Sequence, residues 1–262
     1  MVVNKLSMIF ESSLKRKDRF YLCSDVLNTP LGSVKTQGVL PALRVGDRLV
    51  AEGAGFQVLS VGWVPGDAKS ASGRVYLMES ERDVDSGECQ CIVECGGYSL
   101  AWITLSDKGA AGKRIDESGP LVGDLVVDTL PLTLIQGFII PDEISQLKGL
   151  LVDLALIQGF DLILTTGGTG VGPRDITPEA TLAVIEKRLP GFERAMTAAS
   201  LVKTPHGAIS RAVAGTLGQA VIVNMPGSPK AVAECLEPLL PTFKHTLEKL
   251  QGDPSDCAVL RK

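Results

Sequence analysis

A loop with four glycines and one aspartate is the stretch of this sequence best suited to chemistry. It reads TTGGTGVGPRD over residues 165–175, follows a short apolar run at 162–164 and precedes a helix start at Thr177. A strand, a glycine loop and a helix N-terminus together present backbone N–H groups to a phosphate. Asp175 lies inside this loop, with Arg174 as its neighbouring cation. Because a carboxylate repels a phosphate, the loop indicates that a divalent metal ion or a proton lies between the two.

The spacing of these glycines differs from that of two well-known nucleotide-binding loops. No glycine-lysine pair followed by serine or threonine comes after them, and the G-x-G-x-x-G spacing with a later acidic residue is absent. A P-loop ATPase and an NAD dehydrogenase are therefore disfavoured. Glycines alone can also serve turns and tight packing. The helix start favours a ligand, because Thr177 is predicted to cap the helix and Pro178 to take its first position.

Polar loops follow three other predicted strands, at residues 100–105, 134–140 and 220–223. These loops begin with Ser106-Asp107, Pro141-Asp142 and Asn224 to Ser228. In a parallel sheet, ligands bind beyond the carboxyl ends of the strands, so all four loops should meet at one edge. Asp142 and Ser228 are each predicted to cap the helix that follows.

Helical patterns lie between these strands. They cover residues 119–130, 142–159, 178–188, 191–202 and 229–250, the last divided by its two internal prolines. The alternation predicts an α/β domain over residues 96–262, with a mostly parallel sheet and helices on both faces. Residues 1–95 instead carry short apolar runs separated by Gly, Asp and Ser turns, which predict a small β-rich, barrel-like domain of unknown role.

Three cysteines near the end of that first domain invite a metal interpretation. Cys89, Cys91 and Cys95 lie at odd positions together with Val93, and so on one face of a strand. Zinc sites usually use C-x-x-C pairs and a fourth ligand, and neither is evident here. The sequence therefore predicts that these cysteines pack as small apolar residues, and any further role stays open.

Composition limits the classes of function. The formal net charge is −4 and aromatic residues make up 5% of the 262 residues, so nucleic acid is not an expected partner. No apolar run is long enough for a membrane span, and the first residues lack the features of a secretory signal. Two of the six cysteines, Cys23 and Cys235, are isolated, which is atypical of a disulfide framework. We expect a cytoplasmic protein.

The polar loops contain hydroxyls, carboxylates and glycines, but no imidazole or thiol. The two histidines, His206 and His245, lie outside them. Acid–base catalysis by imidazole and thiol catalysis are therefore disfavoured. Phosphate-binding loops with carboxylates favour phosphoryl or nucleotidyl transfer, in which positioning and metal electrostatics supply most of the catalysis.

Four stretches carry a resemblance to a known family. They are TTGGTGVGPRDITPEAT (165–181), TLSDKGAAGKRIDESGP (104–120), IIPDE (139–143) and NMPGSPKAVAECL (224–236). In their order and residues they closely resemble the motifs of the MogA/MoaB-type molybdopterin adenylyltransferases, the G-domain family of molybdenum cofactor biosynthesis. The resemblance covers about residues 100–250, so the β-rich domain is an addition to that family's minimal fold.

The resemblance implies a cytoplasmic, commonly homotrimeric enzyme that transfers AMP from Mg-ATP to the terminal phosphate of molybdopterin and releases pyrophosphate. The product would pass to a molybdate-inserting enzyme. Asp142 and Asp175 match the family's two essential aspartates, which we interpret as catalytic residues and ligands of Mg²⁺. Nucleotide and molybdopterin binding would fall to Ser106, Asp116, Thr166, Gly167, Gly168, Thr169, Gly170, Gly227 and Ser228.

Two other functions remain open from the sequence. The first is a molybdotransferase of the MoeA type, whose related domain has a similar glycine motif; the extended GPRDITPEA stretch favours the adenylyltransferase. The second is a non-catalytic molybdopterin-binding or scaffold protein, against which the carboxylates at positions 142 and 175 count.

Overall fold

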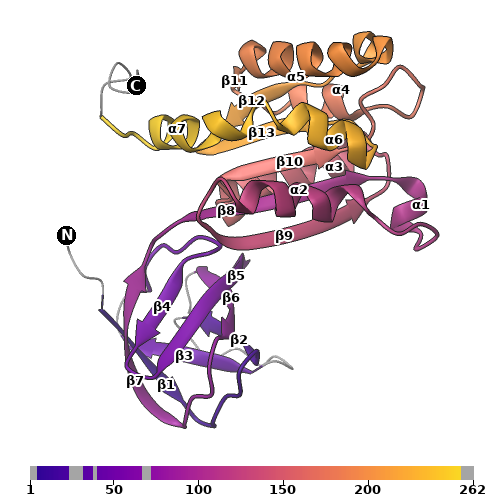
Figure 1. Ribbon diagram of the computed structural model, residues 1–262. Helices are drawn as coiled ribbons and strands as arrows, with labels where there is room; N and C mark the ends of the chain where they lie inside the picture. The colour runs from indigo at the N-terminus through magenta and orange to yellow at the C-terminus, as the bar shows by residue number, and fades with distance from the viewer. Residues whose placement is uncertain (1–4, 24–31, 38–39, 67–71, 255–262) are drawn as a thin grey trace. The chain divides into compact units, whose positions relative to one another are not determined.

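A computed structural model describes residues 5–23, 32–37, 40–66 and 72–254 of the chain. The chain divides into two compact units, Met1–Gly97 and Tyr98–Lys262 (Figure 1). In the described residues of the first unit, the regular elements are all strands, and the second unit alternates strands with helices.

The first unit is a closed barrel with the strand order β1-β3-β2-β6-β5-β4-β7. Its strands are β1 (Lys5–Phe10), β2 (Arg19–Cys23), β3 (Ser33–Gln37), β4 (Arg48–Ala51), β5 (Ala54–Val64), β6 (Gly73–Ser80) and β7 (Gly87–Glu94). Neighbouring strands are antiparallel except β2 and β3, which run parallel. The prediction of a β-rich, barrel-like unit is confirmed.

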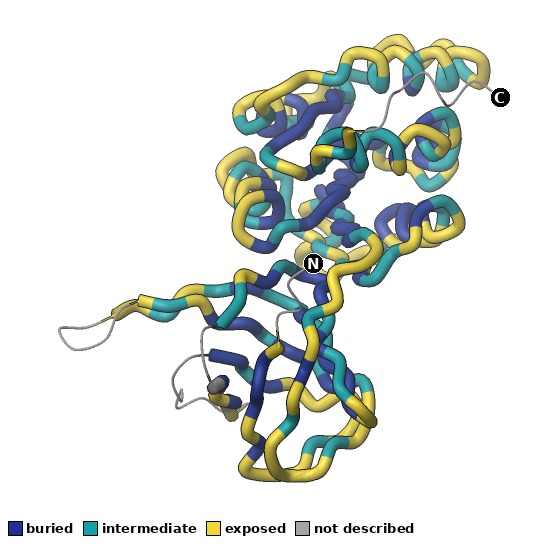
Figure 2. Tube along the Cα trace, turned by 90° about the vertical axis from the view of Figure 1, so that its left-hand side faces the viewer, coloured by how far each residue is buried: buried dark blue, intermediate teal, exposed yellow. Residues whose placement is uncertain are grey.

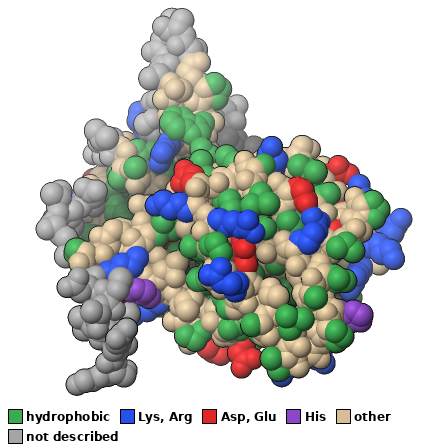
Figure 3. Space-filling model, turned by 90° about the horizontal axis from the view of Figure 1, so that it is seen from above, with side chains coloured by type: hydrophobic (Ala, Val, Ile, Leu, Met, Phe, Trp, Pro, Cys, Tyr) green, Lys and Arg blue, Asp and Glu red, His purple; other side chains and the backbone are tan. Residues whose placement is uncertain are grey.

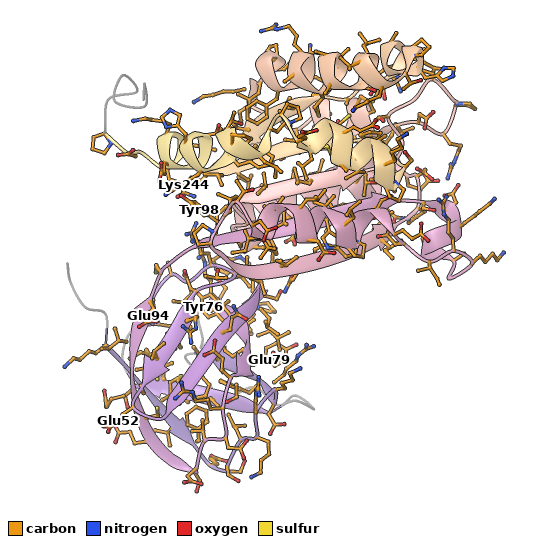
Figure 4. All side chains as sticks on the ribbon, in the orientation of Figure 1. Glu52, Tyr76, Glu79, Glu94, Tyr98 and Lys244 are labelled. Carbon is orange, nitrogen blue, oxygen red and sulfur yellow. The ribbon has the colours of Figure 1, made fainter. Side chains whose placement is uncertain are left out.

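Aromatic side chains fill the barrel. The rings of Phe10, Phe20 and Phe56 lie with centroids 5.3–5.7 Å apart, in stacked and edge-to-face pairs that aromatic rings prefer. Tyr76 is fully buried among the strands (Figure 4). Its hydroxyl donates to the carbonyl of Pro41 at 2.9 Å and accepts from the N–H of Leu43 at 3.1 Å. These two bonds satisfy the phenol and attach the segment before β4 to the barrel wall.

The cysteines of β7 pack as predicted, with one exception. Cys91 is fully buried and Cys89 half-buried, and their Sγ atoms are 3.6 Å apart. Burial raises the pKa of the Cys91 thiol, so it stays protonated. Cys95 lies beyond β7 and is exposed, so the packing prediction is wrong for this residue. In the described part of the chain, no group of three or more His, Cys, Asp or Glu is placed to hold a metal ion.

Cys91→Ser is expected to lower the free energy of unfolding of the barrel by about 1–3 kcal/mol, because it places a hydroxyl in an apolar site. Urea denaturation of purified protein would measure the change. Cys95→Ser is the matched control and should alter stability by no more than about 0.5 kcal/mol, because Cys95 is exposed. Equal effects of the two substitutions would show that burial of Cys91 does not stabilise the barrel.

The second unit is built on a six-stranded sheet with the order β11-β12-β13-β10-β8-β9. Its strands are β8 (Tyr98–Leu105), β9 (Leu132–Ile140), β10 (Leu162–Thr166), β11 (Lys187–Arg188), β12 (Ala214–Leu217) and β13 (Ala220–Met225). The strands β9, β8, β10 and β13 run parallel, as predicted. The antiparallel strands β12 and β11 extend the sheet at one edge and were not predicted.

Helices cover both faces of this sheet, as the alternation predicted (Figure 1). They are α1 (Asp107–Ala110), α2 (Ser118–Val127), α3 (Ile144–Val152) with its π-helical continuation η1 (Asp153–Gln158), α4 (Thr177–Leu182), α5 (Pro190–Lys203), the 3-10 helix η2 (Pro205–Ile209), α6 (Pro229–Leu236) and α7 (Leu240–Leu250). Leu162 and Leu164 of β10 share one apolar core with α2, α5, α6 and α7. Ile163 faces the other side, because side chains alternate along a strand. That side is covered by α3 and α4, and the central strands are buried throughout (Figure 2).

The helix predicted at residues 178–188 is shorter than expected. α4 ends at Leu182, and the chain then joins the sheet through β11. The N–H groups of Glu186 and Leu189 donate to carbonyls of β12, at 2.7 and 2.8 Å. Pairing with β12 therefore replaces the last helical turns, and Pro190 opens α5. The prolines after α6 separate it from α7, as predicted.

Two further properties concern the helices and one face of the surface. No helix in the described ranges is both long and apolar enough to cross a membrane. On the face shown in Figure 3, basic and acidic side chains are interspersed among apolar and polar ones. That face presents no continuous basic surface of the kind that nucleic acids require.

Candidate functional site

The parallel strands end in register, so their loops meet at one edge of the sheet. Thr166 pairs with Thr104 of β8 and with Met225 of β13, and Leu105 pairs with Ile140 of β9. The loops are also bonded to each other: the Thr166 hydroxyl donates to the carbonyl of Pro226 at 3.1 Å. The four polar loops predicted to converge are therefore together.

The first two glycines of the loop occupy positions that no other residue fits. Gly167 and Gly168 have φ angles of 95° and 64°, in the left-handed region. A Cβ on Gly167 would lie 2.7 Å from the carbonyl oxygen of Leu105, and one on Gly168 would collide with the hydroxyl of Thr177. The same position on Gly168 is 3.5 Å from Oδ1 of Asp142. The absence of side chains thus lets the loop backbone approach this carboxylate.

Thr177 does not cap α4, contrary to the prediction. The helix begins at Thr177 itself, and its N-cap residue is Ile176, without a side-chain bond. The Thr177 hydroxyl donates to the carbonyl of Gly167 at 2.8 Å, and its N–H donates to the carbonyl of Gly168 at 3.0 Å. The buried Thr177 therefore fixes the start of the glycine loop.

Asp142 is also not a helix cap. Glu143 is the N-cap residue of α3, and it makes no side-chain capping bond. Asp142 instead exchanges two bonds with Asp107: each backbone N–H donates to the other's carboxylate at 3.2 Å. Burial raises the pKa of Asp142, and the charges of Asp107 and Asp175 add to the rise. Asp142 was predicted both to cap a helix and to act as a functional carboxylate, and its carboxylate makes no capping bond.

Asp175 folds back on its own loop. One oxygen of its carboxylate accepts from the N–H of Gly172 at 2.7 Å, and its own N–H donates to the Gly172 carbonyl at 3.0 Å. A Cβ on Gly170 would come within 2.7 Å of the same oxygen, so Gly170 gives this side chain room. Gly168 lies next to Asp142 and Gly170 next to Asp175, so both predicted catalytic carboxylates adjoin the glycine loop.

Arg174 is paired with acids outside the loop. It donates to both carboxylate oxygens of Asp107, at 2.7 and 2.8 Å, and to Glu143 at 3.0 Å. These bonds lower the pKa of Asp107. Arg174 thus links the loops after β8, β9 and β10 while offsetting part of their negative charge.

A cleft of about 490 Å³ lies between the loops after β8, β10 and β13. Five of the predicted binding residues line it: Ser106, Asp116, Thr166, Gly167 and Gly227. Asp116 accepts from the Thr104 hydroxyl at 2.7 Å and from the N–H groups of Ser118 and Gly119 at 3.1 Å each. The Ser118 hydroxyl donates to the Gly227 carbonyl at 2.9 Å. Asp116 therefore holds the start of α2 against the cleft.

The other four predicted binding residues, Gly168, Thr169, Gly170 and Ser228, do not line this cleft. Thr169 and Gly170 line a separate cavity, of about 680 Å³, beside α5 and η2. Gly168 contacts the Asp142 side. Ser228 caps α6, as predicted, by accepting from the N–H of Ala231 at 3.2 Å. Ser106 likewise caps the short helix α1.

Several residues of this edge escaped the sequence analysis. Thr104 and Ser118 lie within the stretch at 104–120 that resembles the family, but neither was predicted as a site residue. Asn224 was predicted to begin a polar loop and was given no role; it is buried, and its amide donates to the hydroxyls of Thr165 and Thr181 at 3.0 and 2.9 Å. Arg211 lies before β12, a strand that was not predicted. Only the pairing of β12 with β13 brings it to the glycine loop.

Fold and site together define an α/β protein with a glycine loop and two aspartates, Asp142 and Asp175, at the carboxyl edge of its parallel strands. The family described as "Probable molybdopterin binding domain" matches residues 101–245, more than half of the chain. The chain belongs to this family, and within it to the MogA/MoaB type.

Named relatives agree with this assignment. The chain is 36% identical to a molybdopterin adenylyltransferase of Helicobacter pylori, over 58% of this chain and 86% of that protein. It is 38% identical to the molybdenum cofactor synthesis protein cinnamon of Drosophila melanogaster, over 61% of this chain; the match spans only 26% of that longer protein. The crystal structure of the molybdopterin biosynthesis enzyme MoaB from Thermus thermophilus superimposes with a TM-score of 0.55 at 39% identity. It covers 61% of this chain and 99% of its own.

Proposed function

We propose that this chain is a nucleotidyltransferase of molybdenum cofactor biosynthesis, which transfers AMP from Mg-ATP to the terminal phosphate of molybdopterin. The observation that carries the proposal is the position of Asp142 beside Gly168 and of Asp175 beside Gly170, where the glycines leave room for both carboxylates. Relatives named molybdopterin adenylyltransferase support it, at 36–39% identity.

The two aspartates fit a magnesium ion that the substrate helps to hold. Mg²⁺ is usually bound by one or two carboxylates together with substrate phosphates, rather than by a cage made of protein alone. Asp142 and Asp175 would supply two such oxygen ligands, and burial raises the pKa of Asp142 in the metal-free protein. Bound there, Mg²⁺ would offset the repulsion between the two phosphate groups that must approach each other.

The remaining residues would position the two substrates. The terminal phosphate oxygen of molybdopterin attacks the α-phosphorus of ATP, and the bond from that phosphorus to the bridging oxygen of the β-phosphate breaks, releasing pyrophosphate. N–H groups of the loop from Gly167 to Gly170 would orient the triphosphate. The cleft lined by Ser106, Asp116, Thr166 and Gly227 would hold molybdopterin. Arg174, held by Asp107 and Glu143, limits the negative charge that the incoming phosphates meet.

Labelled ATP tests the proposal. The full chain, incubated with α-labelled ATP, molybdopterin and Mg²⁺, is expected to yield labelled adenylylated molybdopterin and pyrophosphate. Omission of Mg²⁺ or addition of a chelator should abolish the product, because the phosphate repulsion is then not offset. Molybdopterin binding without any transfer would indicate a scaffold protein. Consumption of adenylylated molybdopterin in the presence of molybdate would instead indicate a molybdotransferase.

Assembly and location belong to the same proposal. We expect a cytoplasmic homotrimer that hands its product to a molybdate-inserting enzyme. Strand β9 supports self-association, because it forms one edge of the sheet and leaves Ile135 and Ile139 about 40% exposed. Light scattering of the purified chain would measure the number of subunits.

A further inference from the structure

Arg211 makes an unusual set of bonds to the glycine loop. Its Nε donates to the carbonyl of Gly170 at 2.6 Å, and one terminal nitrogen donates to the carbonyl of Asp175 at 2.7 Å. The other terminal nitrogen pairs with the carboxylate of Glu179. Its backbone N–H donates to the carbonyl of Thr169 at 2.9 Å. One residue from outside the loop therefore binds the loop at both ends and the helix that follows it.

These contacts fix the path of the backbone on both sides of Asp175. Between the carbonyls of Gly170 and Asp175 the loop closes on itself through the two bonds of Gly172 and Asp175. The guanidinium spans the ends of that closed turn, so the Asp175 carbonyl cannot move away from Gly170 without breaking a charge-assisted bond. The position of the Asp175 carboxylate depends on this backbone.

We infer that Arg211 is a positioning residue, which holds Asp175 in place for Mg-ATP and leaves the molybdopterin cleft unaffected. This inference rests on the proposed function. Arg211 does not line the cleft beside Asp116, and it contacts the loop through backbone carbonyls. Its planar fork reaches three separate acceptors from three nitrogens, whereas the three N–H donors of lysine all lie on one nitrogen and cannot span those acceptors.

The test compares Arg211→Ala and Arg211→Lys with wild type in the AMP-transfer assay. We expect kcat/KM for Mg-ATP to fall by about 10–100-fold in both variants, as when residues that orient a metal ligand are removed. The Mg²⁺ concentration for half-maximal rate should rise by a similar factor. Binding of molybdopterin alone should match wild type, because its cleft is unchanged.

A second readout does not depend on activity. Hydrogen–deuterium exchange of the metal-free protein should accelerate in the peptide covering residues 169–177 and remain as in wild type across the strands of the second unit. Acceleration throughout the unit would overturn the inference, since Arg211 would then only stabilise the fold. Unchanged exchange together with an unchanged Mg²⁺ requirement would overturn it as well.

Two controls separate the loop contacts from other effects. Arg188→Ala removes an arginine that pairs with Glu193 elsewhere in the unit, at 2.8 and 3.0 Å, and should leave transfer and exchange unchanged. Glu179→Gln removes only the ion pair and keeps both carbonyl bonds, so its rate should stay within about fivefold of wild type. If wild type transfers no AMP, the proposed function fails, and the exchange experiment still decides whether Arg211 holds the loop.

Discussion

Asp175→Asn is expected to lower the rate of AMP transfer by about 10²–10³-fold and to leave the second unit folded. Loss of a metal ligand removes several kcal/mol of charge stabilisation, and each 1.36 kcal/mol corresponds to a factor of ten in rate. The fold should survive because the asparagine side-chain oxygen can still accept the bond from the Gly172 N–H, which is 2.7 Å from the Asp175 carboxylate. Single-turnover rates and circular dichroism would measure the two effects.

The control for this variant is Asp124→Asn, on the exposed side of α2. It removes the same charge from the same unit at a distance from the glycine loop, and it should leave the rate unchanged. Transfer by Asp175→Asn at the wild-type rate would show that Asp175 neither holds nor places the metal. Loss of the circular dichroism signal would instead assign Asp175 a structural role.

The positions of the site residues along the chain could be predicted because local patterns determine them. The parallel strands are continuous apolar runs, and their ends are marked by the polar and glycine residues that follow. Since the carboxyl ends of parallel strands lie at a common edge, the convergence of Asp142, Gly167 and Gly227 followed from the predicted parallel sheet. The glycines at 167 and 168 were identified from their place between a strand and a helix start, and the structure explains their residue type, because their backbone angles exclude other residues.

Contacts between distant segments could not be predicted in this way. Thr177 and Asp142 have residue types that favour helix caps, but tertiary partners take their side chains: Gly167 for the first and Asp107 for the second. The short strand β12 gives no periodic signal over four residues, so its pairing with β13 was missed. Arg211 enters the site only through that pairing. The partners of these side chains are therefore set by hydrogen bonds between distant segments, which local residue preferences do not predict.

Without ligand, Asp142→Asn is expected to be at least as stable as wild type. With Mg-ATP, it is expected to be less stable than wild type. In the metal-free protein, burial raises the pKa of Asp142. For an acid with a raised folded-state pKa, protonation favours folding below the unfolded-state pKa of about 3.9, and this contribution is lost as the pH rises through the folded-state pKa. Asparagine is neutral at every pH. At pH 7 without ligand, the variant should therefore unfold at the same or a higher temperature than wild type.

Addition of Mg-ATP should make the unfolding temperature of wild type higher than that of Asp142→Asn. Mg-ATP at about 100 times its Kd stabilises a protein that binds it by about 2.7 kcal/mol, and the variant should gain little of this. Asp107→Asn is a control of opposite sign: Arg174 lowers the pKa of Asp107, so its charge stabilises the fold at pH 7 and this contribution is lost as the pH falls through the lowered pKa. Thermal unfolding of wild type and both variants, with and without Mg-ATP, would measure these differences. A lower unfolding temperature of Asp142→Asn without ligand, or equal stabilisation by Mg-ATP, would show that Asp142 serves the fold rather than the metal.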